Sequence, residues 1–500
     1  MTLKHFAAKR TSLILHSAGL VLAAGLAVSV QAQPAGIPSI GAASSAELSP
    51  VIERTLGDAI MEQGRRDPSY IDDPEVNQYL TDMGRKLVSH ASGGAQHISI
   101  FSVRDPQINA FALPGGYIGI HSGLVVSAGS ESELASVVAH EIGHVLQRHV
   151  ARGMTQQARS NHIMLASLAA ALLAGLSGSG NLAMGVATFG QAAAIDQQLG
   201  FSRQAEQEAD RIGFGMMSKG GFDPRGMAHM FGRLSIASRL NEGAGGGGYV
   251  STHPLSVQRM SDIENRVRES PPVNHRDSDA FWYVRAKLRI IQARNAQAQG
   301  AAVAQLQQET KQLAGVAQSA AWYGLAYAAW QKKDMEQART ALLNARKNGL
   351  NSPEISSLSV MLALRQNDGN GGLAQARTAW ARWPSSQGVA LTVVSALQSL
   401  GRDKEAVEFL AQRIKQWPDL PRLYQLQAQG YERLGQEVEA RRAMAVYYEK
   451  TGALPTAVEQ LQQARGLSTD FYVQSELDVD IRTLKERLRS DRALLERFKS

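Results

Sequence analysis

The residues best suited to chemistry are His140, Glu141 and His144, which form the pattern H-E-x-x-H. The apolar residues around them recur with helical periodicity, so we predict one buried helix from Glu131 to about Arg152. Side chains four positions apart lie on one face of a helix, and both imidazoles can therefore bind one metal ion. Zinc is the expected ion, one per chain, with Glu141 placed to take the proton of a zinc-bound water that attacks a peptide carbonyl.

A catalytic zinc site needs a third protein ligand, and a second predicted helix, over residues 203–219, offers acidic candidates. Glu206 is the preferred ligand, and Glu208 and Asp210 are the alternatives. Because Glu206 and Asp210 share a helix face, one can bind zinc while the other orients a ligand histidine. Without the paired histidines, these acidic residues would indicate only a solvated helix face.

His253 follows a stretch of almost pure glycine, Gly243 to Gly248, which makes movement of this histidine credible. It could stabilise the oxyanion as water adds to the carbonyl, or it could occupy the fourth zinc position and hold the enzyme latent. A third interpretation is a histidine that caps the turn before Pro254. The remaining histidines of this region are expected to be structural or exposed: His149, His162 and His229.

Composition limits the class of protein. The chain has 500 residues, of which 44% are hydrophobic and 19% charged, and this length favours two or more globular domains. It contains no cysteine, so disulfides, thiol catalysis and thiolate ligands are excluded. The net charge is +7, but basic and acidic residues alternate along the predicted helices, and we expect no nucleic-acid partner.

The N-terminus has the features of an export signal. A basic start is followed by an apolar run from Leu13 to Val30 and by small residues around Ala32. We predict a signal peptide over residues 1–32 and a linker over residues 33–46; an uncleaved N-terminal anchor is the alternative. The mature protein would be soluble in the periplasm or peripherally associated with a membrane.

The elements that must position the zinc ligands fall within a predicted peptidase domain, residues 47–270. Residues 98–103 alternate as a strand does, and Pro114-Gly115-Gly116 marks a turn before a short strand or hairpin. The segment from Met164 to Ile195 is rich in Ala, Gly and Leu. It suits a packed helical hairpin, a lid over the zinc, or a segment that touches a membrane or a membrane-protein partner.

The C-terminal region, residues 277–490, has the pattern of tetratricopeptide repeats. Ala406 lies 68 residues after Ala338, and Ala440 lies 34 residues further on, as a 34-residue repeat requires. The middle repeat looks irregular, because Gly372 stands where the period predicts alanine and Ala376 looks like its displaced substitute. The predicted fold class is therefore mainly α, with a small β-sheet in the zinc-peptidase domain and a C-terminal α-solenoid of about four helix pairs.

The order of these motifs resembles the zinc metallopeptidases that combine H-E-x-x-H with E-x-x-x-D, in particular their exported branch with C-terminal tetratricopeptide repeats. The resemblance covers nearly the whole mature chain. The segments that carry it are residues 109–116, 140–149, 201–203, 206–213, 221–224 and 252–255, followed by the repeats.

The resemblance implies a periplasmic endopeptidase that cleaves misfolded or stalled envelope polypeptides, outer-membrane β-barrel precursors among them. It assigns Glu206 as the third ligand and Asp210 as its companion, in agreement with the choice made from the residues. His253 corresponds to the family's loop histidine. The residues implied to border the cleft and to present an edge strand to an extended substrate are Ala112, Leu113, Pro114, Gly115 and Gly116.

A function of another class is also open. The repeats offer an extended surface for a client or for the outer-membrane assembly machinery, so the protein could be a chaperone or assembly factor whose proteolysis is latent or rare. A carbohydrate-directed hydrolase has little support, because the sequence shows no paired carboxylates of glycosidic type.

Overall fold

The computed structural model describes residues 49–91, 97–156, 173, 201–241, 248–347 and 350–496. The predicted signal peptide and linker, His162 and nearly all of the segment 164–195 lie outside the described residues. The described part of the chain is helical with one small sheet, so the predicted fold class is confirmed. Among its helices, none is both long enough and apolar enough to cross a lipid bilayer.

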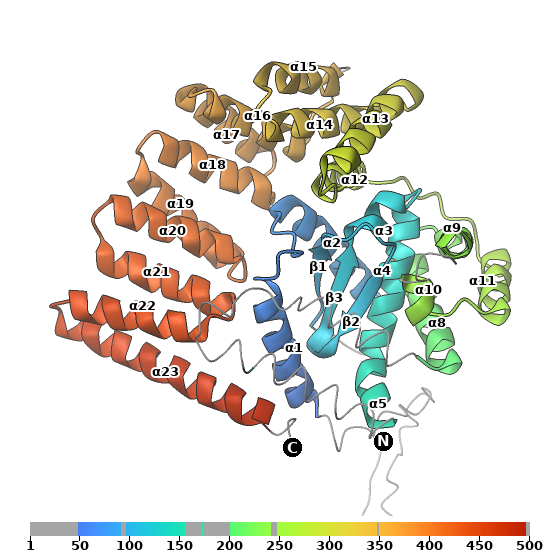
Figure 1. Ribbon diagram of the computed structural model, residues 1–500, viewed down its shortest axis with the longest axis horizontal. Helices are drawn as coiled ribbons and strands as arrows, with labels where there is room; N and C mark the ends of the chain where they lie inside the picture. Colours follow the sequence, from blue (N-terminus) through green and yellow to red (C-terminus); the bar gives the residue numbers. More distant parts are fainter. Residues whose placement is uncertain are drawn as a thin grey trace, which may run out of the picture. The chain divides into compact units, whose positions relative to one another are not determined.

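The N-terminal region is built on a three-stranded sheet with the order β1-β3-β2. Strand β3 (Tyr117–His121) pairs in parallel with β1 (Ser99–Val103) and antiparallel with β2 (Ala110–Leu113). Figure 1 shows α4 beside this sheet, with α8 on the far side of α4. The helices of this region are α1 (Pro50–Gly64), α2 (Pro74–Val88), η3 (Pro114–Gly116), α3 (Ser122–Ser127), α4 (Glu131–Leu146), α5 (His149–Gln156), α8 (Arg203–Lys219), α9 (Arg225–Asn241), α10 (Tyr249–Thr252) and α11 (Val257–Glu269).

The turn between β2 and β3 depends on two glycines. Gly115 has φ +77° and Gly116 has φ +86°, a backbone region that other residues rarely adopt. A Cβ on Gly116 would lie 1.9 Å from the carbonyl oxygen of His97. The predicted hairpin at Pro114-Gly115-Gly116 is thus confirmed, and its turn brings β2 back against β3.

The C-terminal region consists of helices stacked in chain order (Figure 1). Left-handed backbone conformations at Lys333, Asn367, Gly401 and Gly435 follow one another at intervals of 34 residues. The helices are α12 (Asp279–Ile291), α13 (Ala296–Gln312), α14 (Gly315–Gln331), α15 (Met335–Ala345), α16 (Pro353–Arg365), α17 (Gly369–Arg382), α18 (Gln387–Ser399), α19 (Asp403–Gln416), α20 (Pro421–Arg433), α21 (Glu437–Lys450), α22 (Leu454–Leu467) and α23 (Phe471–Glu496).

The expected irregularity of the middle repeat is wrong. The turn residue Asn367 keeps the 34-residue interval on both sides, because asparagine tolerates the left-handed conformation that glycine adopts in the later repeats. Gly372 keeps the alanine position and is buried, and a Cβ there would come within 2.7 Å of Leu364. A smaller residue has replaced alanine at this contact without displacing the repeat.

Both ends of the C-terminal region pack onto the N-terminal region. Phe281 and Val284 of α12 belong to the same hydrophobic core as the apolar residues of α4. Ile481 and Leu484 of α23 belong to a second core, which contains Leu56 of α1 together with residues of all three strands. The two regions therefore share apolar cores, and the predicted boundary near residues 271–276 stays a prediction.

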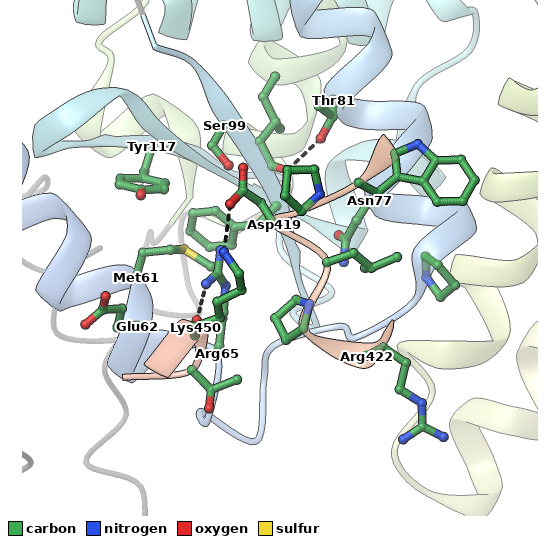
Figure 2. Close-up of a pocket in the computed structure, with 18 of the residues that line it drawn as sticks. Met61, Glu62, Arg65, Asn77, Thr81, Ser99, Tyr117, Asp419, Arg422 and Lys450 are labelled. Atoms are coloured by element: carbon green, nitrogen blue, oxygen red, sulfur yellow. Dashed lines mark hydrogen bonds and ion pairs between the residues drawn. The ribbon is translucent and has the colours of Figure 1, made fainter. Parts of the chain in front are cut away.

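A polar cavity of about 480 Å³ lies where the repeats face α1, α2 and β1 (Figure 2). Lys450 donates to Asp419 at 3.0 Å, and Arg65 donates to the carbonyl oxygen of Lys450. Thr81 donates to the carbonyl oxygen of Ile100 at 3.3 Å, which satisfies one acceptor on the outer edge of β1. Of these contacts, the one between Arg65 and Lys450 crosses from the N-terminal region to the repeats and so contributes to joining them.

A buried lysine provides a second polar link between the regions. Lys287 on α12 is 7% exposed, and its Nζ lies 2.6 Å from Asp73 and 2.7 Å from Glu75 at the start of α2. Burial alone would lower the pKa of Lys287, but the two carboxylates hold it well above its ordinary value. The ammonium group therefore stays charged and ties α12 to α2.

Lys287→Met should destabilise the protein by about 3–5 kcal/mol, because it leaves the buried Glu75 and the partly buried Asp73 without their cation. Urea denaturation of the full chain measures the change in the free energy of unfolding. Lys311→Met, on the exposed face of α13, is the matched control and should change stability by less than about 0.5 kcal/mol. Equal stability of the two variants would contradict the prediction.

Candidate metal centre

Helix α4 supplies the two histidines of the H-E-x-x-H pattern. The Ser130 side chain accepts a hydrogen bond from the backbone N–H of Glu133 and so caps the start of the helix. His140 is 2% exposed and His144 is fully buried, and their Nε2 atoms lie 2.9 Å apart. The helical spacing of four thus brings both rings to one point, as the sequence predicts.

Close contact between α4 and α8 brings Glu206 to the same point. A Cβ on Gly143 would lie 2.9 Å from the carbonyl oxygen of Ala209, and one on Gly213 would lie 3.1 Å from the backbone of Ala139. Only glycine allows the two helix backbones to approach this closely without displacement. The approach leaves Glu206 Oε1 3.3 Å from Nε2 of His144.

His253 completes the cluster. Its Nδ1 lies 3.0 Å from Oε1 of Glu206 and 3.3 Å from Nε2 of His140, and the side chain is fully buried. The donor atoms of His140, His144, Glu206 and His253 all lie within 4.8 Å of one another. Ligands at about 2.0–2.1 Å from zinc in a tetrahedron are about 3.3 Å apart, so this donor set fits one zinc ion.

Glu141 lies beside the cluster with unused acceptor capacity. Its side chain is fully buried, and neither carboxylate oxygen has a hydrogen-bond partner among the described residues. Oε1 is 3.5 Å from Nε2 of His253. A buried carboxylate without hydrogen bonds is costly, and this orientation toward a metal cluster is consistent with a function at the metal.

Asp210 and Arg259 support the ligands from behind. Asp210 Oδ1 lies 2.8 Å from Nδ1 of His140, while Arg259 donates to both oxygens of Asp210, at 2.7 and 2.8 Å. Arg259 Nη1 also lies 2.6 Å from Oε2 of Glu206 and donates to the carbonyl oxygen of Pro254 at 3.0 Å. One arginine on α11 thus connects a ligand carboxylate, the partner of His140 and the His253 loop.

Burial and neighbouring charges shift the pKa values of the residues in the cluster. Burial alone would raise the pKa of Asp210, but hydrogen bonds from Arg259 and His140 lower it. Burial would lower the pKa of His140, yet Asp210 and Glu206 outweigh it and raise this pKa to about 9. Burial dominates at His144 and lowers its pKa well below the ordinary value. A zinc ion bound by His140 would have to displace a proton from this ring, so zinc binding should weaken as the pH falls.

Sequence reasoning did not identify Arg259. The charges of the predicted site could have indicated a missing cation. Glu141, Glu206 and Asp210 carry three negative charges, and one divalent ion compensates only two of them. Two aromatic residues of the site were not predicted either. The ring of Tyr249 stacks on that of His253 with 4.4 Å between centroids, and the ring of Phe201 stacks on it with 5.5 Å between centroids.

The prediction of one continuous helix from Glu131 to Arg152 is wrong. α4 ends at Leu146 and α5 begins at His149, because Arg148 adopts a left-handed conformation with φ +52°. His149 is buried, with its Nδ1 2.9 Å from Nδ1 of His144. Glu208, the alternative zinc ligand, lies outside the cluster and contacts the other ring nitrogen of His149 at 3.1 Å. His229 is exposed, as expected.

A second group of potential ligands, Glu131, His275 and Asp277, lies at the start of α4. The oxygens of Glu131 already accept hydrogen bonds from Tyr79, from His275 and from the backbone and side chain of Ser278. This group ties the segment between the two regions to the zinc-binding helix. Its hydrogen-bonding capacity is in use, which favours a structural function.

Of the five residues expected to border the cleft, Ala112 and Leu113 lie in strand β2, and the other three form the turn η3 that follows it. The backbone carbonyl of Asn109 accepts a hydrogen bond from the N–H of His121. Because hydrogen-bonded residues alternate along an antiparallel pair, the backbone N–H and C=O groups of Ala110 and Ala112 point away from β3. On that outer edge, the carbonyl oxygen of Ile108 accepts a hydrogen bond from the N–H of Tyr249 at 3.0 Å. The outer edge of β2 and the short helix that precedes His253 therefore lie on the same side of the sheet.

Two histidines and a glutamate from facing helices, next to an uncompensated glutamate, form the donor set of a zinc peptidase. The sequence pattern of peptidase family M48 matches residues 74–267, which include the whole cluster. The chain belongs to this family, and its class is that of the zinc metalloendopeptidases.

Two relatives are similar over nearly their whole length. The beta-barrel assembly-enhancing protease of Yersinia pestis is 32% identical over 91% of this chain and 93% of its own. The protein of the same name from Escherichia coli K12 is 30% identical over 93% of this chain and 92% of its own. A relative from Vibrio cholerae is 39% identical over 52% of this chain and about half of its own length, 53%. The first two matches extend into the C-terminal repeats.

Arg259→Lys should weaken zinc binding by about 10- to 100-fold, because one ammonium group cannot replace the paired hydrogen bonds to Asp210 and the contact with Glu206. Zinc retained after dialysis against buffers of fixed free zinc measures the affinity. Arg266→Lys, on the same helix, is the control, since Arg266 forms a partly exposed pair with Asp262. Equal zinc retention by both variants would show that Arg259 does not hold the ligands.

Proposed function

We propose that this chain is an exported zinc endopeptidase of the periplasm that cleaves misfolded or stalled envelope proteins and serves the assembly of outer-membrane β-barrels. The main support is the near full-length similarity to two proteins named beta-barrel assembly-enhancing protease, a similarity that includes the repeats. In this proposal the repeats contact the outer-membrane assembly machinery, and the predicted signal peptide directs export.

In the proposed site, His140, His144 and Glu206 would hold zinc, which would supply Lewis-acid activation of the attacking water. Glu141 accepts the proton of the attacking water and delivers it to the leaving amine. Asp210 fixes the ring of His140 through Nδ1, so that Nε2 faces the metal. Its own orientation is held by the two hydrogen bonds from Arg259.

The proposed substrate groove follows the outer edge of β2. An extended peptide would pair with the outward backbone of Ala112, and Leu113 to Gly116 would border its path. Pairing through the backbone does not depend on side-chain identity, which suits a protease that acts on unfolded chains. A side chain at the turn glycines would meet the backbone of Arg54 at position 115 and that of His97 at position 116, so both positions require glycine to keep the turn in place.

The distances favour the latch interpretation of His253 over the oxyanion interpretation. Its Nδ1 lies at the position of a fourth ligand, where water would otherwise bind, and its ring is stacked by Tyr249 and Phe201. We therefore propose that the structure corresponds to a latent state, and that the segment carrying His253 moves away during turnover.

A chaperone function through the repeats is the second candidate, supported by the array of helix pairs. Deleting the repeats does not test it, because α12 and α23 contribute to cores shared with the peptidase region. An inactive full-length chain separates the two functions. If Glu141→Gln supports outer-membrane assembly in cells as well as the parent does, the repeats carry the function.

Glu141→Gln should bind zinc as the parent does and should lose activity by about 10²- to 10⁴-fold, because the amide cannot accept the proton of the attacking water. Cleavage of an unfolded protein such as casein, together with zinc content, provides the measurement. Glu264→Gln, an exposed position on α11, serves as control. Cleavage by Glu141→Gln at the parental rate would overturn the assignment of this residue.

His253→Ala should raise the cleavage of casein by about tenfold if the latent state accounts for about nine molecules in ten. His229→Ala, an exposed histidine on α9, should leave the rate unchanged. A large loss of activity in His253→Ala with zinc still bound would favour the oxyanion function instead.

A further inference from the structure

The two ligand histidines of α4 are oriented by different partners. Nδ1 of His140 lies against the carboxylate of Asp210 at 2.8 Å, in the E-x-x-x-D pattern. Nδ1 of His144 instead lies 2.9 Å from Nδ1 of a third histidine, His149. His149 is neither part of the H-E-x-x-H pattern nor a donor of the metal cluster, yet it contacts the ring nitrogen of His144 that faces away from the cluster.

The proton positions along this contact follow from the requirement for zinc binding. Two ring nitrogens share a hydrogen bond only if one of them carries the proton. Because Nε2 of His144 faces the metal cluster and must be free to bind zinc, the proton lies on its Nδ1, and His144 donates to His149. His149 is then protonated at Nε2, which points to Oε2 of Glu208 at 3.1 Å.

The local backbone is folded in the way this contact requires. In a continuous helix, a residue five positions after His144 would lie about 140° around the axis and could not reach its ring. The left-handed conformation of Arg148, with φ +52°, breaks the helix and returns His149 toward His144. Arg148 is anchored by Glu53 of α1, with contacts of 3.0 and 2.9 Å.

We propose that His149 and Glu208 form a hydrogen-bonded relay that orients His144 and thereby sets the zinc affinity of the site. The side chain of His149 is 1% exposed, whereas that of Glu208 is 36% exposed and lies 3.6 Å from Arg152. The relay thus runs from the buried metal ligand to the surface of α8. His149 and Glu208 are positioning residues, since neither touches the metal.

The test compares zinc affinity in the full chain, measured by competition with a chromogenic chelator, and the visible absorption of the cobalt-substituted protein. His149→Phe keeps a ring of similar size but removes the acceptor, and it should weaken zinc binding by about 10- to 100-fold and shift the cobalt bands. His149→Gln retains an acceptor and should recover part of the affinity. Glu208→Gln should weaken binding by less than His149→Phe, in the same direction.

The double variant His149→Phe/Glu208→Gln should bind zinc no more weakly than His149→Phe alone, because Glu208 acts through His149. His229→Gln and Glu264→Gln, both exposed, are the matched controls and should keep the parental affinity and spectrum. Glu208→Gln changes only a partly exposed side chain, so it tests the relay even where a change at His149 impairs folding.

Parental affinity and cobalt spectrum in Glu208→Gln would overturn the relay, as would losses in the double variant equal to the product of the single losses. These outcomes differ from a failure of the proposed function. A parent protein that binds zinc tightly but cleaves no polypeptide would contradict the proposed protease activity and would leave the relay intact.

Discussion

The structure around the metal depends on the burial of charge. Glu141, Glu206 and Asp210 are each at most 1% exposed, and burying an ionised carboxylate without compensation costs several kcal/mol. Arg259 supplies one positive charge and a divalent ion supplies two, so the cluster is neutral when zinc is bound. This balance explains why residues from α4, α8 and α11 converge here, although they are far apart in the sequence.

The same constraint connects the site with the rest of the molecule. The glycine contacts between α4 and α8 set the distance between the histidines and Glu206. The start of α4 is held by Glu131, which binds the segment leading to the repeats, and α12 adds apolar residues to the core behind α4. The repeats are thus connected to the helix that carries the H-E-x-x-H pattern through packed side chains, and to α2 through the ion pairs of Lys287.

The sequence predicted the parts of the site that depend on local spacing. His140, Glu141 and His144 were accessible because a helix places positions four apart on one face, and the bounds of α8 agree with the predicted range. The residues that contact the predicted ligands from behind could not be predicted from local spacing. Arg259 and His149 reach the cluster through tertiary contacts, and His149 does so only because Arg148 interrupts a helix whose apolar periodicity continues through the break.

The repeats illustrate the same limit. The 34-residue period was readable from Ala338, Ala406 and Ala440, but one glycine at position 372 suggested a displacement that does not occur. A periodic residue type shows where each repeat begins only if every repeat uses the same residue for the same contact. The backbone turn at Asn367 is the more reliable marker, and it is not visible in composition.

The complete enclosure of the four donor residues has a consequence for the lifetime of the bound ion. A zinc ion held by His140, His144, Glu206 and His253, all at most 2% exposed, would exchange with solvent only after a protein segment moves. If the His253 segment is the one that moves, the opening that admits a peptide also admits a chelator. The rate at which a chelator removes zinc would then measure the rate at which the enzyme opens, without any substrate.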